Sequence, residues 1–156
     1  MKQIIKQSTI DVVQTESLDS STQSLLQKAQ DATRSAYAPY SKFHVGAALR
    51  LDNGTVVLGN NQENAAYPSG LCAERVALFA AKSNHPEAEI LEIVVAVQTE
   101  NEAKQHFTPP CGACLQVLWD VQCRQKSPIK IIVQGVDNQN YVSKNVEQLL
   151  PFGFVL

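Results

Sequence analysis

Three cysteines form the pattern in this sequence that points most directly to chemistry. Cys111 and Cys114 stand three positions apart in a C-x-x-C pair directly behind Pro109-Pro110, and Cys72 precedes them by a long interval. In the first turn of a helix, two cysteines with this spacing point their sulfur atoms at one ion, and zinc binds thiolates at about 2.3 Å. The sequence therefore predicts a zinc site whose protein ligands are Cys72, Cys111 and Cys114.

A fourth ligand is not evident at short spacing. The remaining candidates are His44, His85, His106 and Cys123, and none of them stands close to the three cysteines in sequence. Three protein ligands and an open position are typical of catalytic zinc, because the pKa of a water bound there falls toward ~7. A distant side chain that completed the site would instead indicate a non-enzymatic, zinc-stabilised interaction domain, and this alternative stays open.

Two charged residues follow Cys72 closely. Glu74 lies two positions after it, so its carboxylate is placed to take a proton from a water at the metal, unless the ion captures it as a ligand. Arg75 lies one helical turn beyond Cys72 and offsets the negative charge of three sulfurs, although an ordinary surface arginine is the alternative. Helix amino ends also favour thiolates.

Composition and charge restrict the partners. Thirteen Lys and Arg against fifteen Asp and Glu give a net charge of −2, and the basic residues are scattered, which argues against nucleic acid. No apolar run reaches the ~18 residues that span a bilayer, and residues 1–6 lack the apolar core of a signal peptide. We therefore expect a cytoplasmic protein that binds small neutral molecules and neither nucleic acid nor membrane.

The 156 residues provide enough chain for one domain with a sizeable core. Apolar periodicity, turn residues and prolines predict helices and strands in alternation. The expected elements are a helix from Ser20 with a Ser20-x-x-Gln23 capping box, a hairpin of residues 43–51 and 55–58 around Asn53-Gly54, a helix from about Cys72, a strand at 90–97, a helix from Cys111 to about Gln122, strands at 129–133 and 141–142, and a short helix ended by Pro151.

Two strand-helix-strand units in this order predict an α/β fold, a three-layer α/β/α arrangement with a mixed five-stranded sheet. Residues 1–16 are expected to form an N-terminal arm or edge strand, and residues 17–156 a single catalytic domain. In crossover units each helix begins at the carboxyl edge of the preceding strand. Cys72 and the Cys111/Cys114 pair should therefore meet at one sheet edge, where open α/β sheets bind ligands.

At these residues the sequence resembles a known family. Cys72-Ala73-Glu74-Arg75 together with Pro110-Cys111-Gly112-Ala113-Cys114 resembles the zinc signature of cytidine deaminases, in the three-cysteine variety of short, homotetrameric members. Further segments in family order lie at residues 40–49, 59–67 and 149–151, so the resemblance covers roughly residues 25 to 154.

The resemblance implies zinc-dependent hydrolytic deamination of cytidine and deoxycytidine to uridine and deoxyuridine, with release of ammonia, in pyrimidine salvage. It also implies a homotetramer with sites near the subunit interfaces and one zinc ion per subunit. A deaminase of another cytosine-containing substrate is the alternative. The implied residue roles are zinc ligands at Cys72, Cys111 and Cys114, a proton shuttle at Glu74, ribose contacts at Asn61 and Glu63, nucleoside packing at Phe43, and base orientation by the Ala73 backbone.

The sequence departs from the family pattern at three places. Leu115 stands where many members have an arginine, which removes one cation near the thiolates. The sequence ends at Leu156, soon after Phe154, and either Phe154 or Phe152 corresponds to an aromatic residue that reaches a neighbouring subunit's site. The N-terminal arm is additional, and the sequence assigns it no role.

Overall fold

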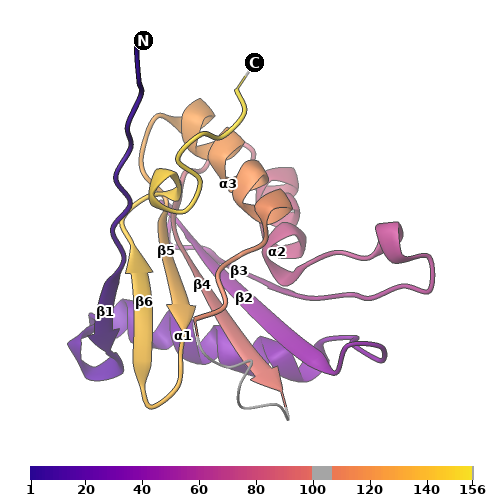
Figure 1. The fold of residues 1–156 in the computed structure, drawn as a ribbon. Coiled ribbons are helices and arrows are strands. Elements are labelled where there is room, and N and C mark those ends of the chain that lie inside the picture. The colour runs from indigo at the N-terminus through magenta and orange to yellow at the C-terminus, as the bar shows by residue number, and fades with distance from the viewer. Residues whose placement is uncertain (100–106, 156) are drawn as a thin grey trace.

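A six-stranded mixed sheet lies at the centre of the computed structural model, which describes residues 1–99 and 107–155 (Figure 1). The strand order is β1-β6-β5-β4-β2-β3. β4 and β5 are parallel, and the other neighbours are antiparallel. The strands are β1 (Asp11–Gln14), β2 (Phe43–Leu51), β3 (Val56–Asn60), β4 (Ile90–Thr99), β5 (Lys130–Gln134) and β6 (Gln139–Ser143).

Helices cover both faces of this sheet, which confirms the predicted α/β/α arrangement (Figure 1). α1 (Ser20–Ala32) packs on one face, and α2 (Ala73–Asn84) and α3 (Gly112–Gln125) pack on the other. No helix in the described ranges is both long enough and apolar enough to cross a membrane. Short 3-10 turns are η1 (Thr15–Ser17), η2 (Thr33–Ser35), η3 (Tyr67–Ser69) and η5 (Val146–Gln148).

The prediction of five strands is wrong, because β1 adds a sixth. Its residues pair antiparallel with β6, with Asp11 opposite Val142 and Gln14 opposite Gln139. Only Val13 in this strand is partly buried, so the apolar alternation that marks a strand in sequence is weak. The strand is held by backbone pairing along the open edge of β6 rather than by a strong apolar face.

The central strands β2 and β4 are buried on both sides. Ala47 and Leu49 of β2 belong to the core beneath α2 and α3, whereas Ala48 faces α1. On β4, Val95 belongs to the core beneath α2 and α3, and Val94 faces α1. A strand between two helical layers needs apolar residues at successive positions, which explains the nearly continuous apolar run of β4.

Two glycines set the distance between helices and sheet. A Cβ atom at Gly59 on β3 would lie 2.4 Å from the carbonyl oxygen of Ala73 and 2.5 Å from the nitrogen of Ala77. A Cβ atom at Gly46 on β2 would lie 2.0 Å from the carbonyl oxygen of Ala29. Glycine is therefore required for α2 and α1 to approach the sheet this closely. For α2 the close approach fixes the first turns of the helix.

A buried ionic cluster joins the sheet to α1. The carboxylate of Glu92 on β4 is almost fully buried and accepts hydrogen bonds from Arg50 Nε at 3.0 Å and from Thr22 Oγ1 at 3.2 Å. Lys130 Nζ lies 3.4 Å from the same carboxylate. Because a buried carboxylate is costly unless it is paired, these contacts fix the relative positions of β2, β4, β5 and α1.

The N-terminus of α1 differs from the predicted capping box. The N-cap is Asp19, whose carboxylate accepts from the Thr22 N–H at 2.9 Å, while the Gln23 side chain donates to the Leu18 carbonyl at 2.7 Å. A hydrogen bond from the Ser21 hydroxyl, followed by those from the Thr22 backbone and hydroxyl, lowers the pKa of Asp19 well below 3.8. The charged carboxylate also interacts favourably with the helix dipole.

We expect Asp19→Ala to lower the free energy of unfolding by about 1 kcal/mol, the usual contribution of an N-cap side chain. Asp19→Asn keeps the hydrogen-bond acceptor and should retain most of this stability at pH 7. The carboxylate's contribution is present above the unfolded pKa of 3.8 and is lost as the pH falls below that value toward the lower folded pKa. Urea unfolding of the three proteins from pH 7 to pH 3 measures this, and an unchanged Asp19→Ala midpoint would contradict the cap assignment.

Candidate metal centre and cavity

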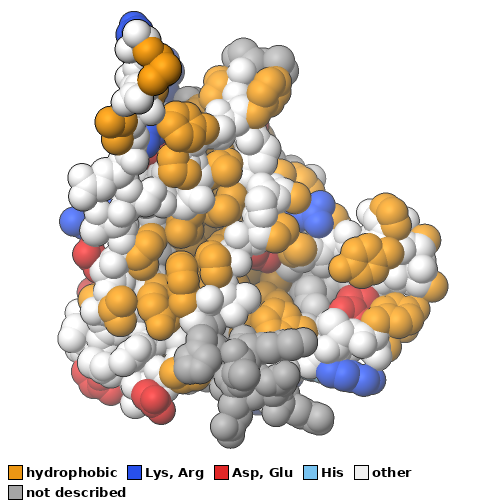
Figure 2. Space-filling model, viewed as in Figure 1, with side chains coloured by type: hydrophobic (Ala, Val, Ile, Leu, Met, Phe, Trp, Pro, Cys, Tyr) orange, Lys and Arg blue, Asp and Glu red, His pale blue; other side chains and the backbone are white. Residues whose placement is uncertain are grey.

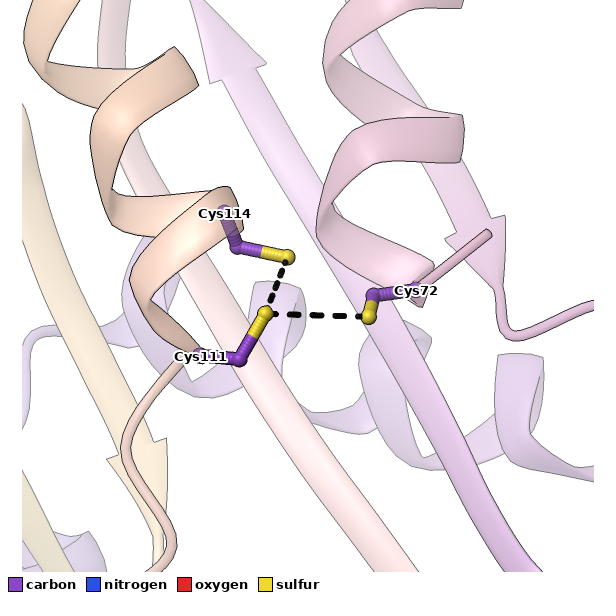
Figure 3. A group of neighbouring side chains, drawn as sticks. All are labelled: Cys72, Cys111 and Cys114. Atoms are coloured by element: carbon purple, nitrogen blue, oxygen red, sulfur yellow. Dashed lines mark hydrogen bonds between the residues drawn. The ribbon is translucent and has the colours of Figure 1, made fainter. Parts of the chain in front are cut away.

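The three predicted cysteine ligands meet where α2 and α3 begin (Figure 3). Cys72 is the N-cap of α2, Cys111 is the N-cap of α3, and Cys114 lies in the first turn of α3. The Sγ atom of Cys111 is 3.9 Å from that of Cys72 and 3.5 Å from that of Cys114. All three sulfur atoms lie within 4.8 Å of one another, so the expected convergence at one sheet edge is confirmed.

This geometry fits a zinc ion. Tetrahedral coordination with bonds of about 2.3 Å places two sulfur ligands about 3.8 Å apart, close to the separations found here. No other histidine, cysteine, aspartate or glutamate of residues 1–99 and 107–155 joins this group. His44, His85 and Cys123 are therefore outside it, and His106 lies outside the described residues. The described residues thus supply three thiols, which is the number of protein ligands typical of a zinc site that keeps a position for water or substrate.

The electrostatic surroundings favour the anionic form of Cys72. A hydrogen bond from the Cys114 thiol, with smaller contributions from Arg75 and Cys111, lowers the pKa of Cys72 to about 5 despite partial burial. The same hydrogen bond, together with burial, raises the pKa of Cys114. Arg75 Nη2 lies 3.8 Å from Cys72 Sγ, close enough to offset its negative charge. A metal cation can therefore bind to the cluster by displacing the protons that remain on the thiols.

Glu74 lies beside the sulfur cluster in the first turn of α2. Its side chain is 5% exposed, yet it contributes to the lining of a cavity. Burial raises the pKa of Glu74, and the negative charge of Cys72 raises it further. A carboxyl group with a raised pKa exchanges protons closer to neutral pH than a solvated glutamate, which is the property of a general acid and base.

A cavity of about 620 Å³ opens next to the cysteines. The loop that carries η3 contributes Tyr67, Pro68 and Gly70 to its lining. This loop projects from the body of the molecule (Figure 1), and Figure 2 shows apolar side chains on the projection. The predicted site residues that line the cavity are Phe43, Asn61, Glu63, Cys72, Glu74, Arg75 and Cys111. Cys114 and Ala73 are buried and do not belong to the lining.

Asn61 is held rigidly at the cavity wall. Its Oδ1 accepts from the Val45 N–H at 2.8 Å, and its Nδ2 donates to the Phe43 carbonyl at 2.9 Å. Both bonds attach the residue after β3 to the beginning of β2. An amide fixed in this way presents its remaining donor and acceptor capacity in one orientation.

Glu63 is fixed by main-chain donors. Its carboxylate accepts from the Tyr40 N–H at 2.9 Å and from the Ser41 N–H at 3.3 Å. Desolvation raises the pKa of Glu63, but the hydrogen bonds from the Ser41 hydroxyl and from both N–H groups outweigh it, so the net shift is downward. Glu63 therefore remains an anion and a hydrogen-bond acceptor at neutral pH.

Several lining residues were missed by the sequence analysis. Val95 and Val97 alternate along β4 toward the cavity, and Thr108 and Pro109 immediately precede the cysteine pair. Strand alternation could have selected the two valines, and proximity to the C-x-x-C motif could have selected Thr108 and Pro109. Tyr67, also in the lining, is 86% exposed. It ends the segment at residues 59–67 that resembles the family, and this resemblance could have selected it.

Comparison with known proteins identifies the family. Residues 19–127 match the family model described as the cytidine and deoxycytidylate deaminase zinc-binding region. The chain belongs to this family. The match includes all three cysteines and the helices that carry them. It confirms the expected zinc dependence and the expected class of enzyme, a zinc-dependent hydrolase.

Relatives and solved structures agree with this assignment. A cytidine deaminase of Halalkalibacterium halodurans is 45% identical over 132 residues, which cover 85% of this chain and 92% of the relative. The crystal structure of cytidine deaminase from Burkholderia pseudomallei matches with a TM-score of 0.72 and 35% identity, over 84% of this chain and 97% of that one. The Mycobacterium tuberculosis enzyme matches with a TM-score of 0.66 and 30% identity, over 88% and 100% of the two chains.

Leu115, which stands where many members of the family have an arginine, is a core residue in this structure. Leu115 is 7% exposed and packs in the core beneath α3. Arg75 is the only lysine or arginine among the described residues that line the cavity. Positive side-chain charge near the sulfur cluster therefore comes from α2 and not from α3.

Substitution of a single ligand tests the metal centre. We expect Cys72→Ser and Cys111→Ser to lose most of the bound zinc, because a serine hydroxyl is a much weaker ligand than a thiolate. Cys123→Ser, outside the cluster, is the matched control and should keep one zinc ion per subunit. Elemental analysis by mass spectrometry after gel filtration gives the stoichiometry. Full zinc content in either ligand variant would contradict the assignment.

Proposed function

We propose that this chain catalyses the hydrolytic deamination of cytidine and deoxycytidine to uridine and deoxyuridine, releasing ammonia, as a step of pyrimidine salvage. The observation that carries the proposal is the buried carboxyl group of Glu74, which contributes to the wall of the cavity beside three convergent sulfur atoms. The relatives described as cytidine deaminases support the choice of substrate.

Zinc bound by Cys72, Cys111 and Cys114 would supply a Lewis acid that lowers the pKa of water. Glu74 accepts a proton from the attacking water and delivers it to ring nitrogen N3 as the new C4–O bond forms. Glu74 then delivers the second proton from that oxygen to the amino group, the C4–N bond breaks, and ammonia leaves. One residue can perform both transfers because burial raises its pKa above that of a solvated glutamate, which makes its protonated form more accessible.

The other cavity residues bind and orient the nucleoside in this proposal. Asn61 and Glu63 receive the ribose hydroxyls, and their anchoring to the β2 backbone and to the loop before β2 supports this role because it fixes their direction. Phe43 packs beside the nucleoside, and the backbone of Ala73 orients the base. Arg75 compensates the charge of the thiolates, as its contact with Cys72 suggests.

The charge of the cavity favours a nucleoside over a nucleotide. Glu63 and Glu74 contribute two carboxyl groups to the lining, and the guanidinium of Arg75 is already engaged with Cys72. Among the described lining residues, a 5′-phosphate would meet the Glu63 carboxylate and find no cation other than Arg75 to balance it. The family includes deoxycytidylate deaminases, so this choice is a real distinction within the family.

The proposed assembly is a homotetramer in the cytoplasm with sites near the subunit interfaces. Residues 17–156 form its single catalytic domain. Phe154 or Phe152 reaches the site of a neighbouring subunit in this arrangement. Both side chains are more than half exposed, at 66% and 69%, which is compatible with that role.

Replacing the proposed general acid and base tests the reaction directly. We expect Glu74→Ala to lower kcat for cytidine by at least ~10²-fold, the usual contribution of general acid–base catalysis. Zinc content should stay at the wild-type level, since Glu74 is not part of the sulfur group. The exposed Glu87→Ala is a control with unchanged kcat. The decrease in ultraviolet absorbance on deamination gives the rate, and near-normal turnover in Glu74→Ala would refute the role.

Substrate choice depends on the Glu63 charge. We expect kcat/KM for cytidine to exceed that for CMP by at least roughly tenfold, because carboxylate and phosphate repel each other in a partly desolvated cavity. Glu63→Gln removes the charge and should narrow this ratio. Steady-state kinetics with cytidine, CMP and single-stranded DNA, at low and high salt, distinguishes a nucleoside substrate from a nucleotide or a polynucleotide. Preference for CMP, or steep salt dependence with DNA, would contradict the proposal.

A further inference from the structure

The two ends of the chain leave the molecule on the same side, at one end of the sheet (Figure 1). Here the arm means residues 1–10 and the tail means residues 146–155. Both lie outside the part of the chain, residues 19–127, that matches the family model. Figure 2 shows apolar side chains exposed on both ends, and those in the arm include Ile4 and Ile5. The contacts between the arm and the tail therefore lie outside the region that the family model describes.

Lys6 connects the arm to the tail at two points. Its ammonium group forms an ion pair with the carboxylate of Glu147. The same nitrogen lies 5.7 Å from the centroid of the Phe152 ring, within range of a cation–π interaction. Thr9 adds a third contact, because its backbone N–H donates to the Gln148 side-chain oxygen at 2.6 Å.

The tail is attached to α3 on its other side. Gln116 forms two hydrogen bonds with the backbone of Phe154: its Oε1 accepts from the N–H at 2.9 Å, and its Nε2 donates to the carbonyl at 2.8 Å. Gly153 packs directly on the indole of Trp119, since a Cβ atom there would lie 2.5 Å from the ring. The tail thus lies between the arm and α3.

Within the tail, η5 is the only helix or strand that the structure describes. The first part of the tail is fixed by packing, because Val146 is fully buried and Leu149 and Leu150 pack against the core. The part after Pro151 has no helix or strand and is ordered by the side chains that hold it. Gln116 stands two positions after Cys114, so the tail is attached next to the turn of α3 that carries two of the sulfur ligands.

We propose that the arm is a brace for the C-terminal tail, with Lys6 as its principal positioning residue. Lys6 and Thr9 hold Glu147, Gln148 and Phe152 from outside, and Gln116 holds Phe154 from α3. The brace keeps Gly153 against Trp119 and presents Phe154 in one position. This inference concerns the order of the tail and does not depend on the identity of the substrate.

The test is hydrogen exchange of the tail amides in the full-length protein. Lys6→Met removes the charge and keeps an apolar stem, so amide exchange at Phe154, whose N–H is hydrogen-bonded to Gln116, should rise roughly tenfold through local opening. Lys6→Arg keeps both the ion pair and the cation–π contact and should restore wild-type exchange. Lys2→Met, on the same arm, is the matched control and should leave exchange unchanged. Gln116→Leu breaks the attachment to α3 and should accelerate exchange at Phe154.

Trp119 provides a second measurement because it is the only tryptophan in the chain. Loss of Gly153 from the indole should shift its fluorescence emission to longer wavelength in Lys6→Met and not in Lys6→Arg. Wild-type exchange and emission in Lys6→Met would overturn the proposal. Equal effects of Lys2→Met and Lys6→Met would overturn it as well, since the arm would then act without this specific contact. None of these outcomes depends on deaminase activity, so the proposed function is tested separately.

Discussion

Three sulfur atoms within 4.8 Å of one another impose the constraint on which this site depends. Thiolates at such distances repel, so the protein must supply positive charge or leave protons on the sulfurs. The chain supplies it in two forms: Cys72 and Cys111 are N-caps, where helix dipoles are positive, and Arg75 contacts Cys72. A divalent cation would balance the remaining negative charge of the three sulfurs. The cluster that holds protons in the absence of metal therefore also fits zinc.

Close packing of α2 on β3 is what brings Cys72 to this position. Gly59 allows the Ala73 carbonyl and the Ala77 nitrogen to lie directly on the strand, and both alanines are fully buried. A larger residue at position 59 would displace the first turns of α2, which hold Cys72 and Glu74. The packing of α2 on the sheet therefore controls the distances among the three cysteine sulfurs. The buried residues of α2 thus help to set the geometry of the candidate metal centre.

The sequence was most informative where chemistry and periodicity are local. The C-x-x-C spacing and the position of Cys72 after a crossover strand were enough to predict that three sulfurs converge, because topology places both helix starts at one sheet edge. Asp19 was missed as the N-cap because Ser20 satisfied the same local pattern, and only the folded position of Thr22 distinguishes the two residues. β1 was not counted in the sheet because its stability comes from distant β6, a partner that no local pattern specifies. The predicted set of cavity residues was likewise incomplete, because Tyr67 and Val97 are far apart in the sequence and come together only in the fold.

Two carboxyl groups share the cavity, and their surroundings shift their pKa values in opposite directions. Glu74 is buried next to the Cys72 sulfur, so desolvation and repulsion favour its protonated form. Glu63 accepts hydrogen bonds from the Ser41 hydroxyl and from two backbone N–H groups, which favour its charged form in spite of desolvation. In the proposed mechanism, this difference gives two chemically equivalent side chains separate functions. A group that must give and take protons needs the first environment, and a group that must accept hydrogen bonds without changing charge needs the second. Exchange of the two environments would abolish both proposed roles although no residue type had changed, so the proposed difference in role depends on the fold around each carboxyl group.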